Sequence, residues 1–357
     1  MIRAHIKELA KKIYRYYQEI HIWYTYEIQA MGNRYPLLNK KNRCAIREYW
    51  SRFGWKIPLL WHRMLYQITG TQTPQFFPES TFVLEILPYM RNSALTTGWG
   101  DKAYLDYHIR GVETAQSVLR NVSGRYIDKD FKLCPWEEAQ TILHAFHSEL
   151  VVKPAINTDT GKGVKLIHPP YDLAEIEREY GKNFVLQLPL FQHDEMKKLN
   201  SSSVNTIRVN SLLLDAQVCI MSAFVKVGEE GAFADNNGHN RFFIGIGEDG
   251  SYLDYAIDHD LRRYNSIPSG YEFARKKVVS FHEICETVKK AHKCIPHFGM
   301  AFWDICIKED GKPAIVEVNL WRPNATIAQA ATRRPFCGKY TDKVLSYVAM
   351  QRKGKNE

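Results

Sequence analysis

One segment, residues 304–319, limits what this chain can fold into more than any other. Two runs rich in Ile and Val flank a central Asp-Gly pair, so the segment is predicted to be a β-hairpin. With the turn centred on this pair, counting outward places Asp304 directly opposite Glu317, with Asn319 on the same face of its strand. Directly opposed like charges destabilise a sheet, and a divalent cation between them removes the repulsion. Two carboxylates and one amide oxygen suit Mg²⁺, with water and phosphate oxygens as its other ligands.

The alternative is a polar row on the solvent-facing side of an edge hairpin. The neighbouring residues argue against a fully exposed pair, because most of them are large and apolar. They are Phe302, Trp303, Ile305, Ile307, Ile315, Val316 and Val318.

Length and composition exclude several classes of protein. A chain of 357 residues with 45% hydrophobic and 24% charged residues is that of an ordinary globular protein with two or three subdomains. Its seven scattered Cys residues contain no CxxC pair, which argues against a disulfide framework and a structural zinc site. No apolar run reaches about 18 residues, and the first residues lack the apolar core of a signal peptide. We therefore expect a cytoplasmic protein.

The net charge of +9 is concentrated near the beginning of the chain. Residues 1–100 hold 14 Lys and Arg against 6 Asp and Glu. A predicted first helix carries a basic stripe formed by Arg3, Lys7, Lys11 and Arg15, with apolar residues on its opposite face. This stripe is either a solvated face or a contact for an acidic glycan or the anionic inner face of a membrane. Nucleic acid is disfavoured, because no RNP-type motif, zinc finger or basic-region helix is present.

The remaining pattern favours α+β subdomains built around antiparallel sheets. Residues 1–68 are predicted to be mostly helical and 69–80 to be a connection. Further helices are predicted near 101–110, after Pro135, and over 172–180, 271–293 and 325–350. Strands are predicted over 150–153, 163–167 and 184–188, with several short ones between 204 and 256.

Three further clusters fit a nucleotide site. Lys153 ends an apolar strand and is followed by a loop that contains Thr160, Gly161, Lys162 and Gly163, whose backbone N–H groups suit phosphate oxygens. Taken alone, this loop is also compatible with an ordinary turn between strands. Asp101 and Lys102 open a helix some fifty residues earlier and supply a second candidate lysine. The strand that ends at Gln187, Leu188, Pro189 and Leu190 has a backbone suited to adenine, and Asp194 beyond it has a carboxylate suited to ribose hydroxyls.

In this order, the clusters resemble the ATP-grasp superfamily. The segments at Gln192–His193, Asn205–Arg208 and Asp235–Asn237 resemble more narrowly its sugar-transfer-associated branch. The resemblance covers roughly residues 85–350. It implies an ATP-grasp fold over 86–350, with subdomains at 86–135, 136–190 and 191–350, a helical extension over 1–85 and a tail over 351–357. In such folds, two α+β subdomains grip ATP between antiparallel sheets.

The resemblance also implies roles for individual residues. Mg²⁺, or alternatively Mn²⁺, would be held by Asp304, Glu317 and Asn319. Phosphates would meet Lys102 and Lys153 under a lid formed by residues 160–163. Adenine would meet Gln187–Leu190, and ribose would meet Asp194. The lid has one glycine fewer than the fullest family pattern, and residues 320–326 replace the usual glycine-containing acceptor loop.

The implied reaction is ATP-dependent ligation of a carboxylate to an amine through an acyl phosphate. Arg208 is the first candidate for holding the acyl phosphate, since a guanidinium fork matches its geometry; an ordinary strand-surface arginine is the alternative. Arg322 and Asn324 are candidates for a substrate carboxylate at a helix start. The expected substrates are a carboxylated sugar or glycan and an amino acid or amine, in surface-polysaccharide or capsule assembly. A sugar kinase on the same fold and a non-catalytic glycan- or nucleic-acid-binding protein are the alternatives.

Overall fold

The chain is described by a computed structural model over residues 35–156, 162–229, 231, 241–321 and 323–354. It divides into two compact units, one of residues 93–323 and one that combines residues up to 92 with 324–357. The predicted basic stripe at residues 3–15 lies outside the described residues, as do Thr160, Gly161 and Arg322.

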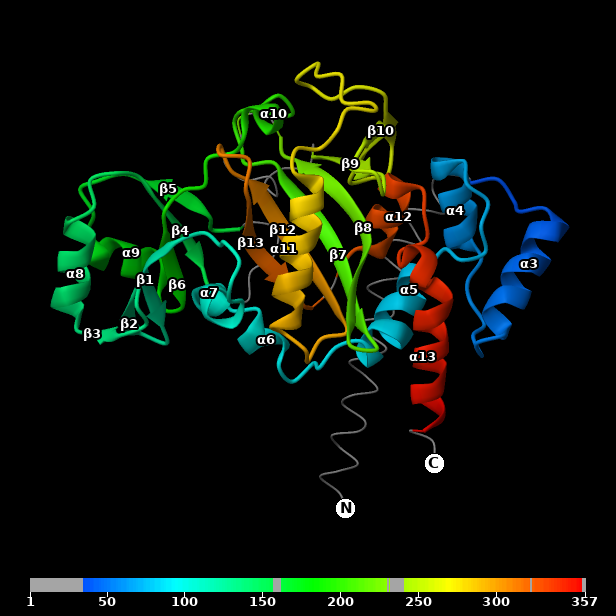
Figure 1. The fold of residues 1–357 in the computed structure, drawn as a ribbon, viewed down its shortest axis with the longest axis horizontal. Helices are drawn as coiled ribbons and strands as arrows, with labels where there is room; N and C mark the ends of the chain where they lie inside the picture. Colours follow the sequence, from blue (N-terminus) through cyan, green and yellow to red (C-terminus); the bar gives the residue numbers. More distant parts are fainter. Residues whose placement is uncertain (1–34, 157–161, 230, 232–240, 322, 355–357) are drawn as a thin grey trace. The chain divides into compact units, whose positions relative to one another are not determined.

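A six-stranded antiparallel sheet lies in the first half of unit 93–323 (Figure 1), in the order β3-β2-β1-β6-β4-β5. Helices α8 (Trp136–His144) and α9 (Leu173–Tyr180) contact one another, and their apolar faces share a core with the sheet. The Asp172 side chain begins α9 by accepting the Ala174 N–H at 2.8 Å. The strands are β1 Ser117–Val122, β2 Arg125–Asp128, β3 Leu133–Cys134, β4 Leu150–Pro154, β5 Lys165–Ile167 and β6 Phe184–Gln187.

A seven-stranded antiparallel sheet forms the rest of this unit, in the order β11-β10-β9-β8-β7-β12-β13. Helix α11 (Phe281–Lys293) contacts β7, β8, β12 and β13 and buries Ile284, Val288 and Ala291 (Figure 1). The strands are β7 Thr206–Leu214, β8 Gln217–Val227, β9 Phe242–Ile246, β10 Tyr252–Asp258, β11 Arg263–Tyr264, β12 Met300–Ile307 and β13 Pro313–Asn319. Four short helices complete the unit: α6 Thr96–Trp99, η4 Lys102–Tyr104, α7 Leu105–His108 and α10 Asp194–Lys197. The expected α+β class with antiparallel sheets is confirmed.

The predicted hairpin is β12–β13, and Asp304 does pair with Glu317. The turn that produces this register differs from the expected one. Lys308 pairs with Lys312, so three residues form the loop, and Gly311 takes the left-handed conformation with φ +79°. Pairing that continued from this turn would place Asp304 opposite Val316. A bulge next to Asp304 shifts the register by one residue and brings Glu317 opposite it instead.

Two predicted helices begin or end differently. Residues 271–280 are not helical: their backbone bonds to the loop between β9 and β10, for example from the Val278 N–H to the Gly250 carbonyl at 2.9 Å. The helix predicted over 325–350 is two helices, α12 (Ala325–Thr332) and α13 (Thr341–Lys353), with a short η5 (Gly338–Tyr340) between them. Arg333 ends α12 in the left-handed conformation, and Pro335 cannot continue the helical hydrogen bonding.

The other unit is helical in its described residues. Its helices are α3 Lys40–Ser51, α4 Leu60–Thr69, α5 Glu79–Thr81, η2 Phe82–Ile86 and η3 Leu87–Tyr89, with α12 and α13 from the end of the chain. The two parts share an aromatic core that includes Trp50, Phe77, Phe82 and Phe336. None of the described helices is both long and apolar enough to cross a membrane.

Candidate nucleotide and metal site

A row of three charged residues crosses the seven-stranded sheet. Arg208 on β7 pairs with Asp304 on β12, which pairs in turn with Glu317 on β13. Directly paired residues point to the same face of a sheet, so strand pairing alone brings the three side chains together.

Asp304 is the most enclosed of the three, with 1% of its surface exposed. Its Oδ1 accepts from Arg208 Nε at 2.6 Å, and its Oδ2 accepts from Arg208 Nη2 at 2.8 Å and lies 3.0 Å from Lys226 Nζ. Burial alone would raise the pKa of this carboxyl, but the charges of Arg208 and Lys226 outweigh burial and hold the pKa well below its usual value. Asp304 is therefore ionised at neutral pH.

Glu317 and Asn319 complete a group of oxygen-bearing side chains around Asp304. Asn319 Nδ2 lies 3.0 Å from Glu317 Oε1 and 3.3 Å from Asp304 Oδ2, and Lys102 Nζ lies 3.7 Å from Glu317 Oε2. Two facing carboxylates suit a divalent cation such as Mg²⁺, and Asn319 would add its side-chain oxygen if the amide, whose Nδ2 donates to both carboxylates here, turned over. In the described part of the chain, no three His, Cys, Asp or Glu side chains cluster in a way that could hold a metal ion. A cation here would therefore take its remaining ligands from water or phosphate.

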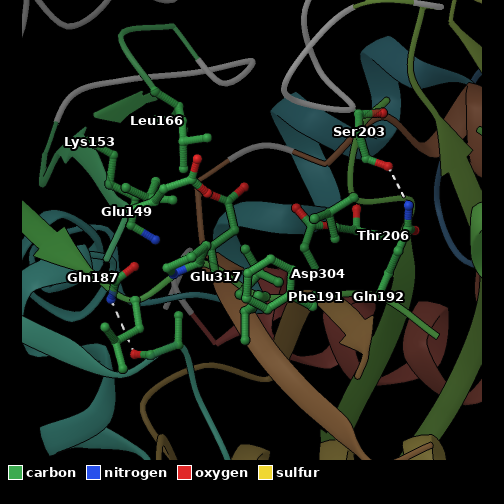
Figure 2. Close-up of a pocket in the computed structure, with 18 of the residues that line it drawn as sticks. Glu149, Lys153, Leu166, Gln187, Phe191, Gln192, Ser203, Thr206, Asp304 and Glu317 are labelled. Atoms are coloured by element: carbon green, nitrogen blue, oxygen red, sulfur yellow. Dashed lines mark hydrogen bonds between the residues drawn. The ribbon is translucent and has the colours of Figure 1, made fainter. Parts of the chain in front are cut away.

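These carboxylates face a cavity of about 290 Å³ between the two sheets of unit 93–323. Figure 2 shows Lys153, Leu166 and Gln187 on one side, from the six-stranded sheet, and Asp304 and Thr206 on the other, with Glu317 between. Valine, leucine and proline side chains supply much of the remaining wall. A flat apolar ligand with a charged end fits such a lining.

Lys153 is buried at the charged end of the cavity, with 6% of its surface exposed. Burial and the nearby positive charge of Lys102 lower its pKa to about 8, while Glu317 opposes the shift. The backbone N–H of Lys102 donates to the Ala155 carbonyl at 2.9 Å, which fixes Lys102 beside the end of β4. Two lysines are thus held next to one another, an arrangement that an anionic ligand would stabilise.

The Gln187–Leu190 segment runs along the cavity from the end of β6. The Gln187 side chain donates to Ser117 Oγ at 3.1 Å, and the Leu188 N–H donates to the Gln116 carbonyl at 2.9 Å. Pro189 has no N–H. The Leu190 N–H is therefore the hinge donor left for a ligand.

The cavity brings together seven of the residues that the sequence singled out: Lys102, Lys153, Gln187, Leu188, Leu190, Asp304 and Glu317. Arg208 and Asn319 contact its carboxylates.

Three further predicted site residues are described but do not line the cavity. Lys162 and Gly163 form an exposed turn before β5. The Asp194 side chain is 85% exposed and pairs with Lys197 at 3.0 Å.

Two features of the site were missed in the sequence. Lys226 lines the cavity with 4% of its side chain exposed, and the signal was a lysine within the apolar run of β8. The wall at residues 201–203 is braced by Gln192, whose side chain donates to the Asn200 and Ser203 carbonyls at 3.1 and 2.6 Å and accepts from the Asn205 N–H at 2.9 Å (Figure 2). That network depends on side-chain orientations which local sequence does not reveal.

Comparison with known proteins gives a family match over residues 179–342, to the family described as sugar-transfer associated ATP-grasp. No curated protein matches the sequence. Among solved structures, the chain is similar to D-alanine–D-alanine ligase from Bacillus anthracis, with 14% identity, a TM-score of 0.41, and coverage of 79% of this chain and 78% of that one. It is also similar to an L-amino acid ligase from Bacillus licheniformis, with 16% identity, a TM-score of 0.38, and coverage of 74% of this chain and 49% of that one. A third similar structure is the ATP-grasp ligase PsnB in complex with a precursor peptide, with 16% identity, a TM-score of 0.41, and coverage of 72% of this chain and 62% of that one. The chain spans between half and four fifths of the length of these three.

Proposed function

The chain belongs, through residues 179–342, to the sugar-transfer associated ATP-grasp family, and from this premise we propose that it is an ATP-dependent ligase which joins a carboxylate to an amine and releases ADP. One observation carries the proposal. The row of Arg208, Asp304 and Glu317 opens onto a cavity that also holds Lys102, Lys153 and Lys226. These six residues comprise four cations and two carboxylates, and a polyphosphate would balance the excess of positive charge.

Asp304, Glu317 and Asn319 are the residues that would hold Mg²⁺ or Mn²⁺. When bound, the cation would neutralise charge on the phosphate oxygens. The support for this set is that its two carboxylates are direct cross-strand partners and that the Asn319 side chain lies against both, with its amide oxygen available as a ligand once the amide turns.

The other residues of the cavity would bind and orient ATP. Lys102 and Lys153, adjacent at the charged end of the cavity, would contact the phosphates, and the lid at residues 160–163 would close over them. The base would lie along the apolar wall and accept a hydrogen bond from the Leu190 N–H. Asp194, which points to solvent here, would serve the ribose only if the segment near it closes inward.

Arg208 and Lys226 would act on the transferred phosphoryl group. A carboxylate is a poor acyl donor, so the γ-phosphoryl of ATP passes to it and gives an acyl phosphate, which the amine then attacks. Fixed cations stabilise the negative charge that develops in both steps. Lys226 is held 3.0 Å from Asp304 and faces the cavity, so it needs little reorganisation to do this.

For the substrates, we propose a uronate-type sugar carboxylate and an amino-acid amine, used in surface-glycan assembly. Arg322 is the candidate for holding a substrate carboxylate. The start of α12 is less suitable than expected, because Glu79 Oε2 already accepts the Thr326 N–H at 2.8 Å and Asn324 Oδ1 accepts the Ile327 N–H at 2.9 Å.

Hydroxylamine distinguishes a ligase from a kinase. With ATP, Mg²⁺ and glucuronate, a ligase should convert hydroxylamine to a hydroxamate and release ADP, because an acyl phosphate reacts with this nucleophile. A sugar kinase would release ADP and leave a stable phosphate ester. A lack of ADP above background with a panel of uronates and amino acids would refute the substrate assignment.

Nucleotide binding is tested separately by thermal unfolding with Mg²⁺ and a non-hydrolysable ATP analogue. A ligand at a hundred times its Kd stabilises by about 2.7 kcal/mol. The shift should require Mg²⁺ and disappear in Glu317→Ala. A wild-type shift or wild-type turnover in that variant would refute the assignment of Glu317 to the metal.

A further inference from the structure

Helix α3 exposes four basic residues, alongside Cys44, Ala45, Glu48 and Ser51. Lys40, Lys41, Arg43 and Arg47 are all exposed, and none of them pairs with an acidic group within the described ranges. Glu48 is the single acidic residue of the helix. Basic residues three or four apart on one helix repel each other. The exposed surface of α3 therefore carries four basic residues against one acidic residue.

The position of these charges on α3 adds to the repulsion. Lys40, Lys41 and Arg43 lie among the first four residues, the positive end of the helix dipole, where anionic groups are favoured and cations are not. The first turn contains no acidic residue, and Asn39 caps it by accepting the Asn42 N–H at 2.8 Å. An anion outside the protein would relieve both effects.

A large apolar side chain lies directly before this helix. Leu37 is 79% exposed, whereas Tyr35 and Leu38 on either side of it are buried. Arg63 donates to the Tyr35 carbonyl and, at 3.2 Å, to the Pro36 carbonyl. The chain is thus anchored on both sides of Leu37, and its outward direction is set by the local fold.

We propose that the basic residues of α3 and Leu37 together bind an anionic lipid surface. A soluble polyanion would satisfy the charges and leave Leu37 in water. The headgroup layer of an anionic bilayer supplies negative charge and, just below it, an apolar region that suits an exposed leucine. The inference stands apart from the proposed ligase activity and uses only residues 37–47.

The test is cosedimentation of the full chain with phosphatidylcholine vesicles, with and without phosphatidylglycerol. The wild type should bind only the anionic vesicles and should be released by salt. Each basic residue near such a surface raises the partition coefficient about fivefold, so K40Q/R43Q/R47Q should bind about 100-fold more weakly. Leu37→Ser should weaken binding about tenfold.

The matched control is K182Q/K290Q/K293Q, which removes the same number of charges from exposed lysines of unit 93–323 and should bind like the wild type. Equal binding by the two triple variants would overturn the proposal, because net charge alone would then explain the affinity. It would also be overturned if Leu37→Ser bound vesicles normally while soluble heparin competed fully, since the partner would then be a soluble polyanion. Unchanged thermal midpoints ensure that a loss of binding is not a loss of fold.

Discussion

Replacing Asp304 and Glu317 one at a time distinguishes the roles of two carboxylates that would share a cation but lie in different surroundings. Asp304 is 1% exposed and is the counter-charge of both Arg208 and Lys226, whose side chains are 15% and 4% exposed. Asp304→Asn keeps the shape of the side chain and leaves two buried cations facing an amide. Breaking a buried ion pair in this way costs about 3–5 kcal/mol.

Glu317→Gln should lower the free energy of unfolding much less than Asp304→Asn does. Its side chain is 23% exposed, its cationic partner is 3.7 Å away, and it faces another carboxylate, so losing its charge also removes a repulsion. We expect a change of about 1 kcal/mol or less. Both variants should lose Mg²⁺-dependent turnover, but only the first should be markedly less stable.

Differential scanning calorimetry measures the difference. For a unit of this size, about 2–4 °C is expected per kcal/mol, so Asp304→Asn should melt about 10 °C lower and Glu317→Gln within a few degrees of the wild type. Removing one stranded cation, in Asp304→Asn with Lys226→Met, should recover part of the loss. The control adds Lys102→Met instead, which should recover nothing because Lys102 pairs with Glu317. Equal stability of the two single variants, or no recovery with Lys226→Met, would refute this account of the site.

Three other outcomes follow from particular groups. Nucleotide affinity should fall between pH 7 and 9, because Lys153, with a pKa of about 8, loses its charge there. Titration calorimetry should show that the affinity of Lys153→Arg changes less with pH, because arginine keeps its charge. Burial lowers the pKa of His292 to about 4, so the stability it contributes is complete above pH 6.5 and falls by about 3 kcal/mol as the pH drops to 4. Urea unfolding should show this loss in the wild type and a smaller loss in His292→Asn. Gln192→Ala should lower the free energy of unfolding by about 2–3 kcal/mol, because it removes the donor to the buried Ser203 carbonyl and the acceptor of the Asn205 N–H. Gln192→Glu should not recover this loss in thermal unfolding, because it keeps the acceptor but turns a carboxylate oxygen toward the Asn200 and Ser203 carbonyls.

The hairpin illustrates what the sequence could and could not predict. Alternating apolar residues and an Asp-Gly pair were sufficient to predict two antiparallel strands and the meeting of Asp304 with Glu317. The predicted turn was wrong by one residue. A bulge next to Asp304, which has no local sequence signal, shifts the register by one residue and restores the predicted pairing. Register near a bulge depends on which side chains the neighbouring strand buries, here Ile305 and Ile315, and so on the tertiary fold.

Long-range packing accounts for most of the remaining differences. Residues 271–280 have a helix-like composition, yet their backbone groups find partners in the β9–β10 loop, and local propensity yields to that pairing. Lys226 was overlooked because its partner Asp304 is distant in sequence and becomes adjacent only when β8, β7 and β12 assemble. Sequence does not reveal which way the Asp194 side chain points, which depends here on its pairing with Lys197 at the surface.

The two carboxylates also differ in how much of their hydrogen-bonding capacity remains. Arg208, Lys226 and Asn319 make one contact with Oδ1 of Asp304 and three with Oδ2, and a carboxylate has about four lone-pair sites. Glu317 receives the Asn319 amide at 3.0 Å, also contacts Asp304 and lies 3.7 Å from Lys102, so it is less enclosed by cations than Asp304 and more open to a new ligand.

Glu317 should therefore dominate the affinity for a divalent cation, while Asp304 mainly fixes the positions of Arg208 and Lys226. Mn²⁺ binding followed by electron paramagnetic resonance in the presence of nucleotide tests this division. Glu317→Gln should abolish binding, and Asn319→Ala, which frees a lone pair on each carboxylate but removes one ligand, should weaken it less. A variant at Glu317 that bound Mn²⁺ normally would show that Asp304 has the larger role, against the contacts that surround it here.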